Sequence, residues 1–596
     1  MKKIASILLC SLTIIIGLVS CDEPEEEALV PLTANPTSLD FDYHGGVKTI
    51  ALTSGIDPTV SCPAKWCKVE KSAFADNALT LTVTVDENSG TADLTTQIRI
   101  IGEKQSLMLD VHQGVSEVQF TLSTDQAEFS GVGGIREVSI LSSMQPEVAL
   151  DNSCDWCTVE RSDIDESRAT TMRVFAAVNL SGAARTATAT VTCGEETKSF
   201  TISQSAFTAP STATAAAVTP ETFAATLGMG WNLGNHMDSH SNGYSSETAW
   251  GNKKCTQATF DAVRTAGFTT VRIPITWMGQ MGNGPEYKVK DAWMDRVEEI
   301  VGYAEKAGLN CIINIHHDGA DSNYWLNIKQ AAASDANNRK IRAQFAQLWY
   351  QIAERFKEKG DFLIFEPFNE VHDGGWGWSD DFKNNPTQQT TILNGWCQLF
   401  TDVVRATGGK NATRWLASPG YTANPDFTMK YMSIPTDYVS VNRQIAVCHF
   451  YDPNEFTLEC TKGEWGHTAA KDKKASWGDE DNVVSVFSRL HDTFVAKGIP
   501  VYVGECGCSG RDDARERLFQ KYYMEYVFKA AHDYNLPLVV WDNGATSSGK
   551  ESHGYFDHAT GAIIGNASEI IAIMKKATFD NSASYTLQSV YDNAPE

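Results

Sequence analysis

The chain has 596 residues, which is more than one ordinary hydrophobic core accommodates and predicts roughly two to four domains. It carries 49 Lys and Arg against 74 Asp and Glu, a formal net charge of −25. Such acidity argues against nucleic acid and anionic membrane surfaces as partners, because both attract basic patches. It favours a neutral ligand, and the 15 Trp provide flat rings for stacking, although most Trp are expected to be core.

The N-terminus predicts export. Lys2 and Lys3 precede an apolar run, 4–19, which is short for a bilayer span and indicates a signal peptide over residues 1–20. Leu18-Val19-Ser20-Cys21 resembles a bacterial lipobox, so we expect cleavage before Cys21 and a lipid on its thiol; an ordinary signal peptide is the alternative. The acidic tether 21–32 is similar to the export tag of Bacteroidetes surface lipoproteins. We therefore expect a monomeric cell-surface lipoprotein, anchored to the outer membrane and not spanning it.

Cysteine usage is less informative. Of the 14 cysteines, Cys10 leaves with the signal peptide and Cys21 is the expected anchor; the others show no paired spacing typical of zinc sites. Cys154-Asp155-Trp156-Cys157 has the form C-x-x-C, but it lies in a strand-rich region without a βαβ unit, which argues against a thioredoxin-like motif. Disulfides suit an exported protein, and the sequence leaves their connectivity open. We expect neither a metal ion nor an organic cofactor.

Residues 33–206 contain an internal repeat. Phe41, Gly45-Gly46, Trp66-Cys67 and Gln113 recur as Phe129, Gly133-Gly134, Trp156-Cys157 and Gln204, at an offset of 88 to 91 residues. Alternating runs such as 79–85 predict half-buried strands, so we expect two small all-β immunoglobulin-like sandwiches, 33–116 and 117–206. The pattern resembles the BACON domain, which implies either glycan binding or a spacer, and we favour the spacer. The Ala/Thr/Ser/Pro-rich linker, 207–217, is expected to be mobile.

From residue 218 the pattern changes to alternating strands and helices. Eight short apolar runs predict strands at 227–235, 270–277, 310–318, 362–370, 414–420, 445–451, 500–507 and 537–544. Helical periodicity separates most of them, for example over 339–359 and 515–533. Eight such units over 218–578 predict a (β/α)8 TIM barrel, followed by a C-terminal tail, 579–596. A doubly wound open sheet is the alternative, but no G-x-G-x-x-G follows the first strand.

Polar residues end seven of these strands, where a barrel places its functional groups. Glu370 and Glu505 end the fourth and seventh strands, which face each other across a barrel of eight. Two glutamates across the mouth are suited to flank one glycosidic bond. A separation of about 5–5.5 Å gives retention of configuration through a glycosyl-enzyme, and about 6.5–9.5 Å gives inversion. The sequence leaves this distance open.

The region 218–578 resembles glycoside hydrolase family 5, most closely subfamily 4. The resemblance rests on GWNLGN at 230–235, ETAWGN at 247–252, VRIPITW at 271–277, INIHHD at 313–318, FEPFNEVHDG at 365–374, HFYDP at 449–453, VGECG at 503–507 and VVWDNG at 539–544. It implies a retaining mechanism, with Glu370 as general acid/base of raised pKa and Glu505 as ionised nucleophile. The groups implied to support them are Arg272, His316, Asn369, His449 and Tyr451. The expected substrate-binding residues are Asn235, His317, Trp250, Trp376, Trp378, Trp541 and Asn543.

Two positions depart from the family pattern. Asn-Glu-Pro is Asn-Glu-Val here, and His236 replaces a Thr, a change that is expected to alter a negative subsite. Metal binding by His316 and His317 is a competing interpretation, but adjacent strand residues point to opposite faces, so we expect no shared ion.

The resemblance implies an endo-β-1,4-glucanase of plant cell-wall β-glucan. We favour xyloglucan, because the Gly-rich loop 372–378 is able to bend wide and carries Trp376 and Trp378. Both Trp either stack on a branched chain or pack the loop against the barrel rim. Mixed-linkage β-glucan, β-mannan and xylan are alternative substrates, and a surface glycan-binding lipoprotein without activity is the alternative outside enzymes.

Overall fold

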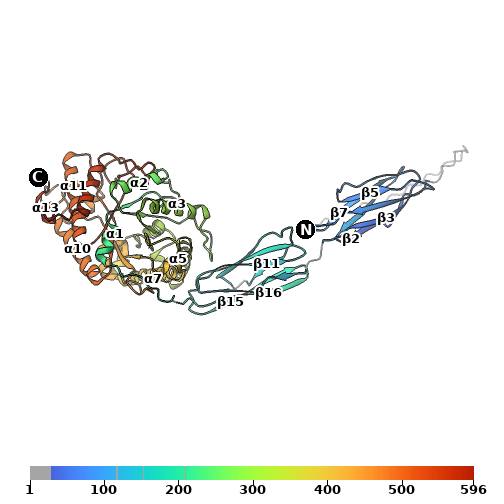
Figure 1. Ribbon diagram of the computed structural model, residues 1–596, viewed down its shortest axis with the longest axis horizontal. Helices are drawn as coiled ribbons and strands as arrows, with labels where there is room; N and C mark the ends of the chain where they lie inside the picture. The colour runs from blue at the N-terminus through green and yellow to red at the C-terminus, as the bar shows by residue number, and fades with distance from the viewer. Residues whose placement is uncertain (1–28, 91, 116–118, 152–153, 209) are drawn as a thin grey trace, which may run out of the picture.

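The computed structural model describes residues 29–90, 92–115, 119–151, 154–208 and 210–596; the expected signal peptide and Cys21 lie outside them. Two β-sandwiches and a barrel follow one another in an elongated arrangement (Figure 1). This confirms the predicted fold class. Among the described residues, no helix has the length and apolar character needed to cross a membrane.

Each sandwich consists of two four-stranded sheets. In the first, β1 (Thr33–Asn35), β3 (Gly46–Thr53), β6 (Ala78–Val85) and β5 (Cys67–Lys71) face β2 (Ser38–Phe41), β8 (Ser106–Gln113), β7 (Leu94–Ile101) and β4 (Thr59–Ser61). In the second, β10 (Gln126–Phe129), β16 (Glu196–Gln204), β15 (Arg185–Cys193) and β12 (Glu147–Leu150) face β13 (Cys157–Arg161), β14 (Ala169–Ala176), β11 (Gly134–Leu141) and β9 (Thr121–Leu122). Alternation fills the space between sheets, as in β6, which buries every second side chain.

The repeated glycine and glutamine have a common structural cause. Gly45 and Gly133 adopt φ of 71° and 76°, and a Cβ on either would lie 2.2 or 2.0 Å from a carbonyl oxygen of the facing strand. Gln113 and Gln204 are buried, and their amides donate to two and three backbone carbonyls, respectively, at the same corner. These residues recur because each sandwich closes that corner in the same way.

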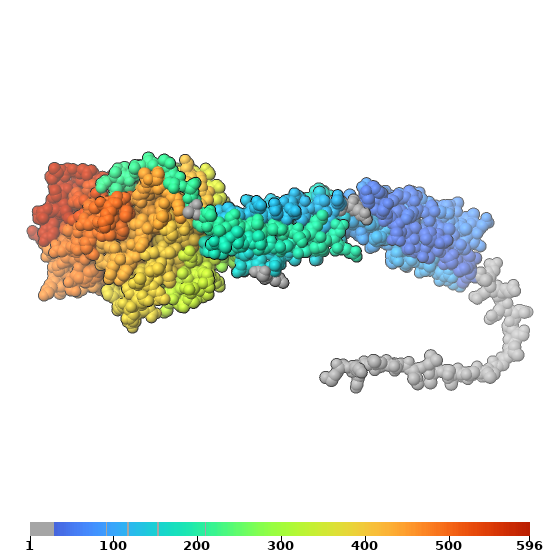
Figure 2. Space-filling view, turned by 90° about the horizontal axis from the view of Figure 1, so that it is seen from below, coloured from blue at the N-terminus to red at the C-terminus, as the bar shows by residue number. Residues whose placement is uncertain are grey.

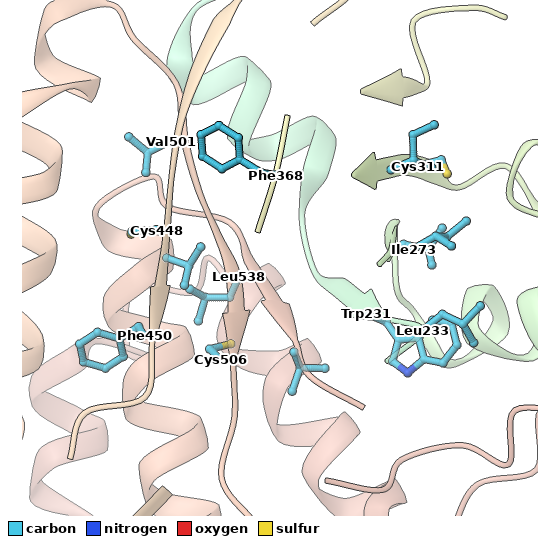
Figure 3. Close-up of a cluster of buried hydrophobic side chains, with 14 of the residues drawn as sticks. Trp231, Leu233, Ile273, Cys311, Phe368, Cys448, Phe450, Val501, Cys506 and Leu538 are labelled. Carbon is cyan, nitrogen blue, oxygen red and sulfur yellow. The ribbon is translucent and has the colours of Figure 1, made fainter. Parts of the chain in front are cut away.

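The C-terminal half is a closed barrel of eight parallel strands, which excludes the open sheet. The strands are β17 (Gly230–Asn232), β20 (Thr270–Ile273), β21 (Asn310–Asn314), β22 (Leu363–Glu366), β23 (Leu416–Pro419), β24 (Gln444–Phe450), β25 (Val501–Cys506) and β26 (Leu538–Val540). The main surrounding helices are α2 (Gln257–Ala266), α3 (Asp291–Ala307), α5 (Asp335–Phe356), α7 (Pro386–Ala406), α10 (Glu480–Thr493), α11 (Ala514–Asp533) and α12 (Ala567–Phe579). Figure 3 shows members of the large core cluster to which these strands contribute, including Trp231, Ile273 and Cys448.

The inside of the barrel is layered. Ile312, Ile364 and Tyr502 belong to a buried cluster that Phe223 of α1 (Pro220–Leu227) joins. Because side chains alternate along a strand, the residues two positions further towards the mouth face the same interior. These include Asn314 and Glu366, so a polar layer lies directly above the apolar one. The functional groups stand on this layer.

The linker is attached to the barrel, so the prediction that it is mobile is wrong. Ala213 forms a parallel bridge with Val439: its N–H donates to Tyr438 O at 2.8 Å, and its carbonyl accepts from Ser440 N–H at 2.8 Å. Arg443 also donates to Ala216 O at 2.9 Å. Backbone groups make these contacts, which is why a composition without core-forming side chains gave no sign of them.

The second sandwich contacts the barrel, and Figure 2 shows the two surfaces abutting. Arg173 of β14 pairs with Glu286 at 2.6 Å, and both side chains are at least three-quarters buried. Val178 belongs to the barrel's core cluster. The C-terminal segment 579–596, expected as a tail, contains α13 (Leu587–Asp592), whose Val590 is buried in the same cluster.

Candidate active site

Arg272 of β20 organises the polar layer at the mouth. Its guanidinium is fully buried, and all of its N–H-bearing nitrogens have partners. Nε and Nη2 donate to Glu366 at 3.1 and 2.6 Å, and Nη2 also donates to Asn369 at 2.7 Å. Nη1 donates to Glu505 Oε1 at 2.8 Å and to Asn232 at 3.0 Å. Burial of a cation is compensated here by two carboxylates, and its planar donors fix both of them in orientation.

Glu505 ends β25 and has three supporting groups. Besides Arg272, the Tyr451 hydroxyl donates to Oε2 at 3.3 Å, and His316 Nε2 lies 3.9 Å from Oε1. Burial raises the pKa of the Glu505 carboxyl, and the positive charges of His449 and Arg272 oppose this effect. Burial also lowers the pKa of His316, so this imidazole is neutral.

Glu370 follows β22 and pairs with His449 of β24, whose Nδ1 lies 2.6 Å from Glu370 Oε1. Burial disfavours the imidazolium, but the carboxylates of Glu505 and Glu370 outweigh it and raise the pKa of His449. Burial alone would raise the pKa of Glu370, yet the charge of His449 lowers it. The raised pKa expected of Glu370 is therefore found on His449 and, through burial, on Glu505, which was expected to be the more acidic carboxyl of the two. Across 2.6 Å the two groups hold one proton, and its placement on Glu370 gives the acid.

The two glutamates approach each other closely. One oxygen of Glu370 and one of Glu505 lie within 4.8 Å of each other, with a His449 nitrogen inside the same limit. This distance between nearest oxygens is shorter than the separation of about 6.5–9.5 Å between the carboxyl groups of inverting enzymes. It is close to the spacing of about 5–5.5 Å that suits direct attack on a sugar carbon.

Glu366 is a site residue that the sequence reasoning missed. It is fully buried and accepts from Arg272, from Asn314 Nδ2 at 2.9 Å and from the Tyr502 hydroxyl at 2.6 Å. Burial would raise its pKa, but Arg272 lowers it, so the group is ionised. The available signal was an acid inside the apolar run Leu363–Glu366, opposite an Arg inside another run.

His316 and His317 lie side by side, which corrects the expectation that they point to opposite faces. They follow the end of β21, where the backbone leaves the strand, and their rings are 4.5 Å apart and perpendicular. Together with Asp238 they offer ligand atoms within 4.8 Å of one another. His317 Nε2 is 3.5 Å from Asp238 Oδ2, while His316 stacks parallel to Trp541 at 5.8 Å. His316 therefore lies next to Glu505, and His317 lies beside His316, near Asp238 and Trp250.

Exposed aromatic residues lie on loops at the mouth of the barrel. Trp250 is 42% exposed and lies 5.2 Å from the His317 ring, with its indole N–H bonded to His240 O. Trp376 and Trp378 are 50% and 73% exposed, so they do not merely pack loop 372–378 against the barrel. Three open rings provide flat surfaces for sugar faces.

Three polar positions have local structural roles. His236 is fully buried, and its ring contacts Cys255 N–H, Lys253 O and Glu247, so it is not open to direct contact with a ligand. The Asn543 amide bonds within its own loop, to Glu551 O and His553 N–H. Asn235 adopts φ of 53° and donates its backbone N–H to Asp238.

Comparisons with known proteins agree with this geometry. The family model of cellulase (glycosyl hydrolase family 5) matches residues 234–547, and the BACON model, an N-terminal binding domain, matches 56–113 and 149–205. Endoglucanase A of Paenibacillus barcinonensis is 37% identical over 56% of this chain and 83% of that protein. The structure of a GH5-4 broad specificity endoglucanase from Bacteroides salanitronis is 50% identical, covers 61% of this chain and 96% of that one, and has a TM-score of 0.60. A Bacteroides ovatus GH5 xyloglucanase in complex with a XXXG heptasaccharide is 28% identical and covers 77% and 100%, with a TM-score of 0.55.

Proposed function

The chain belongs to glycosyl hydrolase family 5 and is an endo-acting β-glucanase, and we propose that it cleaves internal β-1,4 bonds with retention of configuration, preferring xyloglucan. The separation of Glu370 and Glu505, at most 4.8 Å between one oxygen of each, supports the retaining mechanism.

In the first step, Glu505 attacks the anomeric carbon while the proton held by Glu370 and His449 passes to the leaving oxygen. Arg272 and the Tyr451 hydroxyl orient the attacking carboxylate. The Glu505 carboxylate loses its negative charge when it forms the ester. Glu366 still balances Arg272 at that point, so no buried cation is left unpaired.

In the second step, Glu370 takes a proton from an incoming water, which attacks the same carbon and releases Glu505. His449 accepts or returns this proton at its 2.6 Å contact, so the pair carries the proton through both steps. The neutral His316 and the ring of Trp541 bound the sugar on the Glu505 side.

The assignment of roles is tested with a dinitrophenyl cellobioside, whose leaving group needs little protonation. We expect Glu505→Ala to lose turnover on polymer and aryl glycoside alike. Glu370→Ala should still form the glycosyl-enzyme, seen as a burst of dinitrophenol followed by slow turnover. Equal loss by both variants on this substrate contradicts the assignment, and an inverted first-formed anomer in NMR contradicts the retaining mechanism.

The preference for xyloglucan rests on the exposed aromatic residues at the mouth of the barrel. Trp376 and Trp378 lie on one loop and are 50% and 73% exposed, which suits a main chain that carries xylosyl branches. A comparison of kcat/KM on xyloglucan, barley β-glucan, carboxymethylcellulose, glucomannan and xylan tests it. Xyloglucan should rank first; faster hydrolysis of mannan or xylan than of every glucan refutes the substrate while leaving the mechanism intact.

We also propose that the mature protein is a monomer held at the outer membrane by a lipid on Cys21. The lipobox-like 18–21 and the acidic 21–32 support this proposal. In cells, Cys21→Ala should leave an unprocessed or soluble protein, whereas the unaltered chain should partition with membranes. Equal partitioning of the two chains with the outer membrane, both lacking residues 1–20, contradicts the anchor.

A further inference from the structure

Each sandwich brings two cysteines together at the same place. Cys154 Sγ lies 2.8 Å from Cys157 Sγ in the second sandwich. In the first, Cys62 packs against the apolar core that contains Cys67, and its side chain is close enough to contribute to the raised pKa of the Cys67 thiol. Cys67 and Cys157 are the first residues of equivalent strands, β5 and β13.

The two cysteine pairs occupy equivalent positions because of the fold and not because a sequence motif was copied. Cys67 follows Cys62 at an offset of five residues, and Cys157 follows Cys154 at an offset of three. Both pairs nevertheless lie on the connection between the two sheets, from β4 to β5 and from β12 to β13. The second member of each pair is buried and the first is half-buried. A covalent bond at this position would tie one sheet to the corner that leads from the other.

These thiols are poor candidates for a catalytic redox motif. Reactive cysteines need a stabilised thiolate, commonly at a helix N-terminus or beside a cation. Here the second cysteine starts a strand, and burial raises the pKa of the Cys67 thiol to about 12. The same burial protects a bond once it has formed.

We propose that Cys154–Cys157 and Cys62–Cys67 are disulfides in the mature protein. An exported thiol oxidant with a disulfide of its own supplies the oxidation: two S–H bonds break, one S–S bond forms, and two electrons and two protons convert the oxidant's disulfide to a dithiol. Closing the Cys154–Cys157 contact to a bond of about 2.05 Å requires a movement of only about 0.8 Å. The proposal rests on export to an oxidising compartment and is independent of the catalytic function.

Peptide mapping of the purified mature chain, alkylated before and after reduction, tests both pairings. Trypsin cleaves after Lys65, between Cys62 and Cys67, and a protease that cleaves before Asp155 separates Cys154 from Cys157. Without reduction, each pair of fragments should stay joined, and the mass should be lower by two hydrogens for each bond. The chain is oxidised with glutathione disulfide beforehand, so that a failure of export is not mistaken for a failure of pairing. Separate fragments, alkylated in full after this oxidation, overturn the proposal.

Variants extend the test to stability. Cys154→Ser should lower the melting temperature of its sandwich by about 5–10 °C, to the value that the unaltered chain shows in reductant, because the unfolded chain gains freedom. Cys193→Ser is the matched control: this half-buried cysteine lies in the same sandwich with its Sγ near Met144 O, and it should change neither the map nor the melting temperature. A Cys193–Cys154 or Cys193–Cys157 linkage in the map also overturns the proposal. Activity on β-glucan should be the same in all variants.

Discussion

Glu366→Gln tests whether the second carboxylate on Arg272 is part of the catalytic machinery. Gln has the same shape but only one accepting oxygen, while Glu366 accepts from four donors on Arg272, Asn314 and Tyr502. The Tyr502 hydroxyl is able to turn and accept from the amide. Either orientation of the Gln amide leaves one Arg272 N–H facing an N–H. The fully buried guanidinium also keeps only Glu505 as counter-ion.

The structure sets the size of the effect. A hydrogen bond to a charged group contributes about 1.5–3 kcal/mol, and removing one partner of a buried pair costs about 3–5 kcal/mol. Because Glu505 still balances the guanidinium, we expect the free energy of unfolding of the barrel to fall by about 3 kcal/mol. Arg272 is then free to shift towards Glu505 and hold its lone pairs more tightly. A loss of about 1.4–2.8 kcal/mol in the attack step corresponds to a 10–100-fold lower kcat/KM.

The assay is kcat/KM on the dinitrophenyl cellobioside, which reports attack by the nucleophile, together with denaturant unfolding. Asp437→Asn is the matched control, since Asp437 also binds an Arg through both oxygens, Arg405 Nε at 2.7 Å and Nη2 at 2.8 Å. It precedes β24, at the end of the barrel opposite the mouth. This control should lose comparable stability and keep its kcat/KM. If Glu366→Gln also keeps its kcat/KM, the reasoning is refuted and Glu366 is only a structural group.

Three further predictions follow from other contacts. His449→Gln should move the basic limb of the pH profile of kcat/KM to lower pH. The reason is that two groups that share a proton retain it to higher pH than Glu370 alone does. A basic limb at the same or a higher pH contradicts the shared proton. Trp378→Ala should lower kcat/KM on xyloglucan about tenfold and leave the aryl cellobioside unaffected, and equal losses on both would point to misfolding. Arg173→Glu should speed proteolysis of the linker, and adding Glu286→Arg should restore resistance; failure of this rescue contradicts the ion pair.

The barrel and its two glutamates could be predicted because their signals are local. Each strand is a short apolar run, and Glu370 and Glu505 stand where two such runs end. Glu366 could not be found in this way. The role of Glu366, an acid inside an apolar run, depends on its ion pair with Arg272, which is distant in sequence and adjacent in the barrel. Contacts between side chains on different strands form when the sheet closes, and the residue spacing within either strand does not predict them.

Protonation is a second quantity that local sequence does not encode. The resemblance assigned the raised pKa to Glu370, but the raised pKa values are found on His449, whose imidazole faces two carboxylates, and on Glu505, which is buried. The charge of His449, with smaller contributions from His372 and Arg272, lowers the pKa of Glu370. The chemistry needs a proton within reach of the leaving oxygen, and a contact of 2.6 Å provides it from either atom. The requirement for a proton therefore applies to the Glu370–His449 pair and not to Glu370 alone.

The position of the second sandwich depends on contacts of a kind that composition hides. Its linker bonds to the barrel through the N–H and carbonyl of Ala213, which any residue except Pro offers in full. A low-complexity segment is therefore compatible with a fixed path wherever unpaired backbone N–H and carbonyl groups lie beside it. Together with the buried Arg173–Glu286 pair, this path holds the sandwich against one side of the barrel. A sandwich attached in this way has a fixed orientation relative to the catalytic mouth, which a flexible tether of the same composition does not provide.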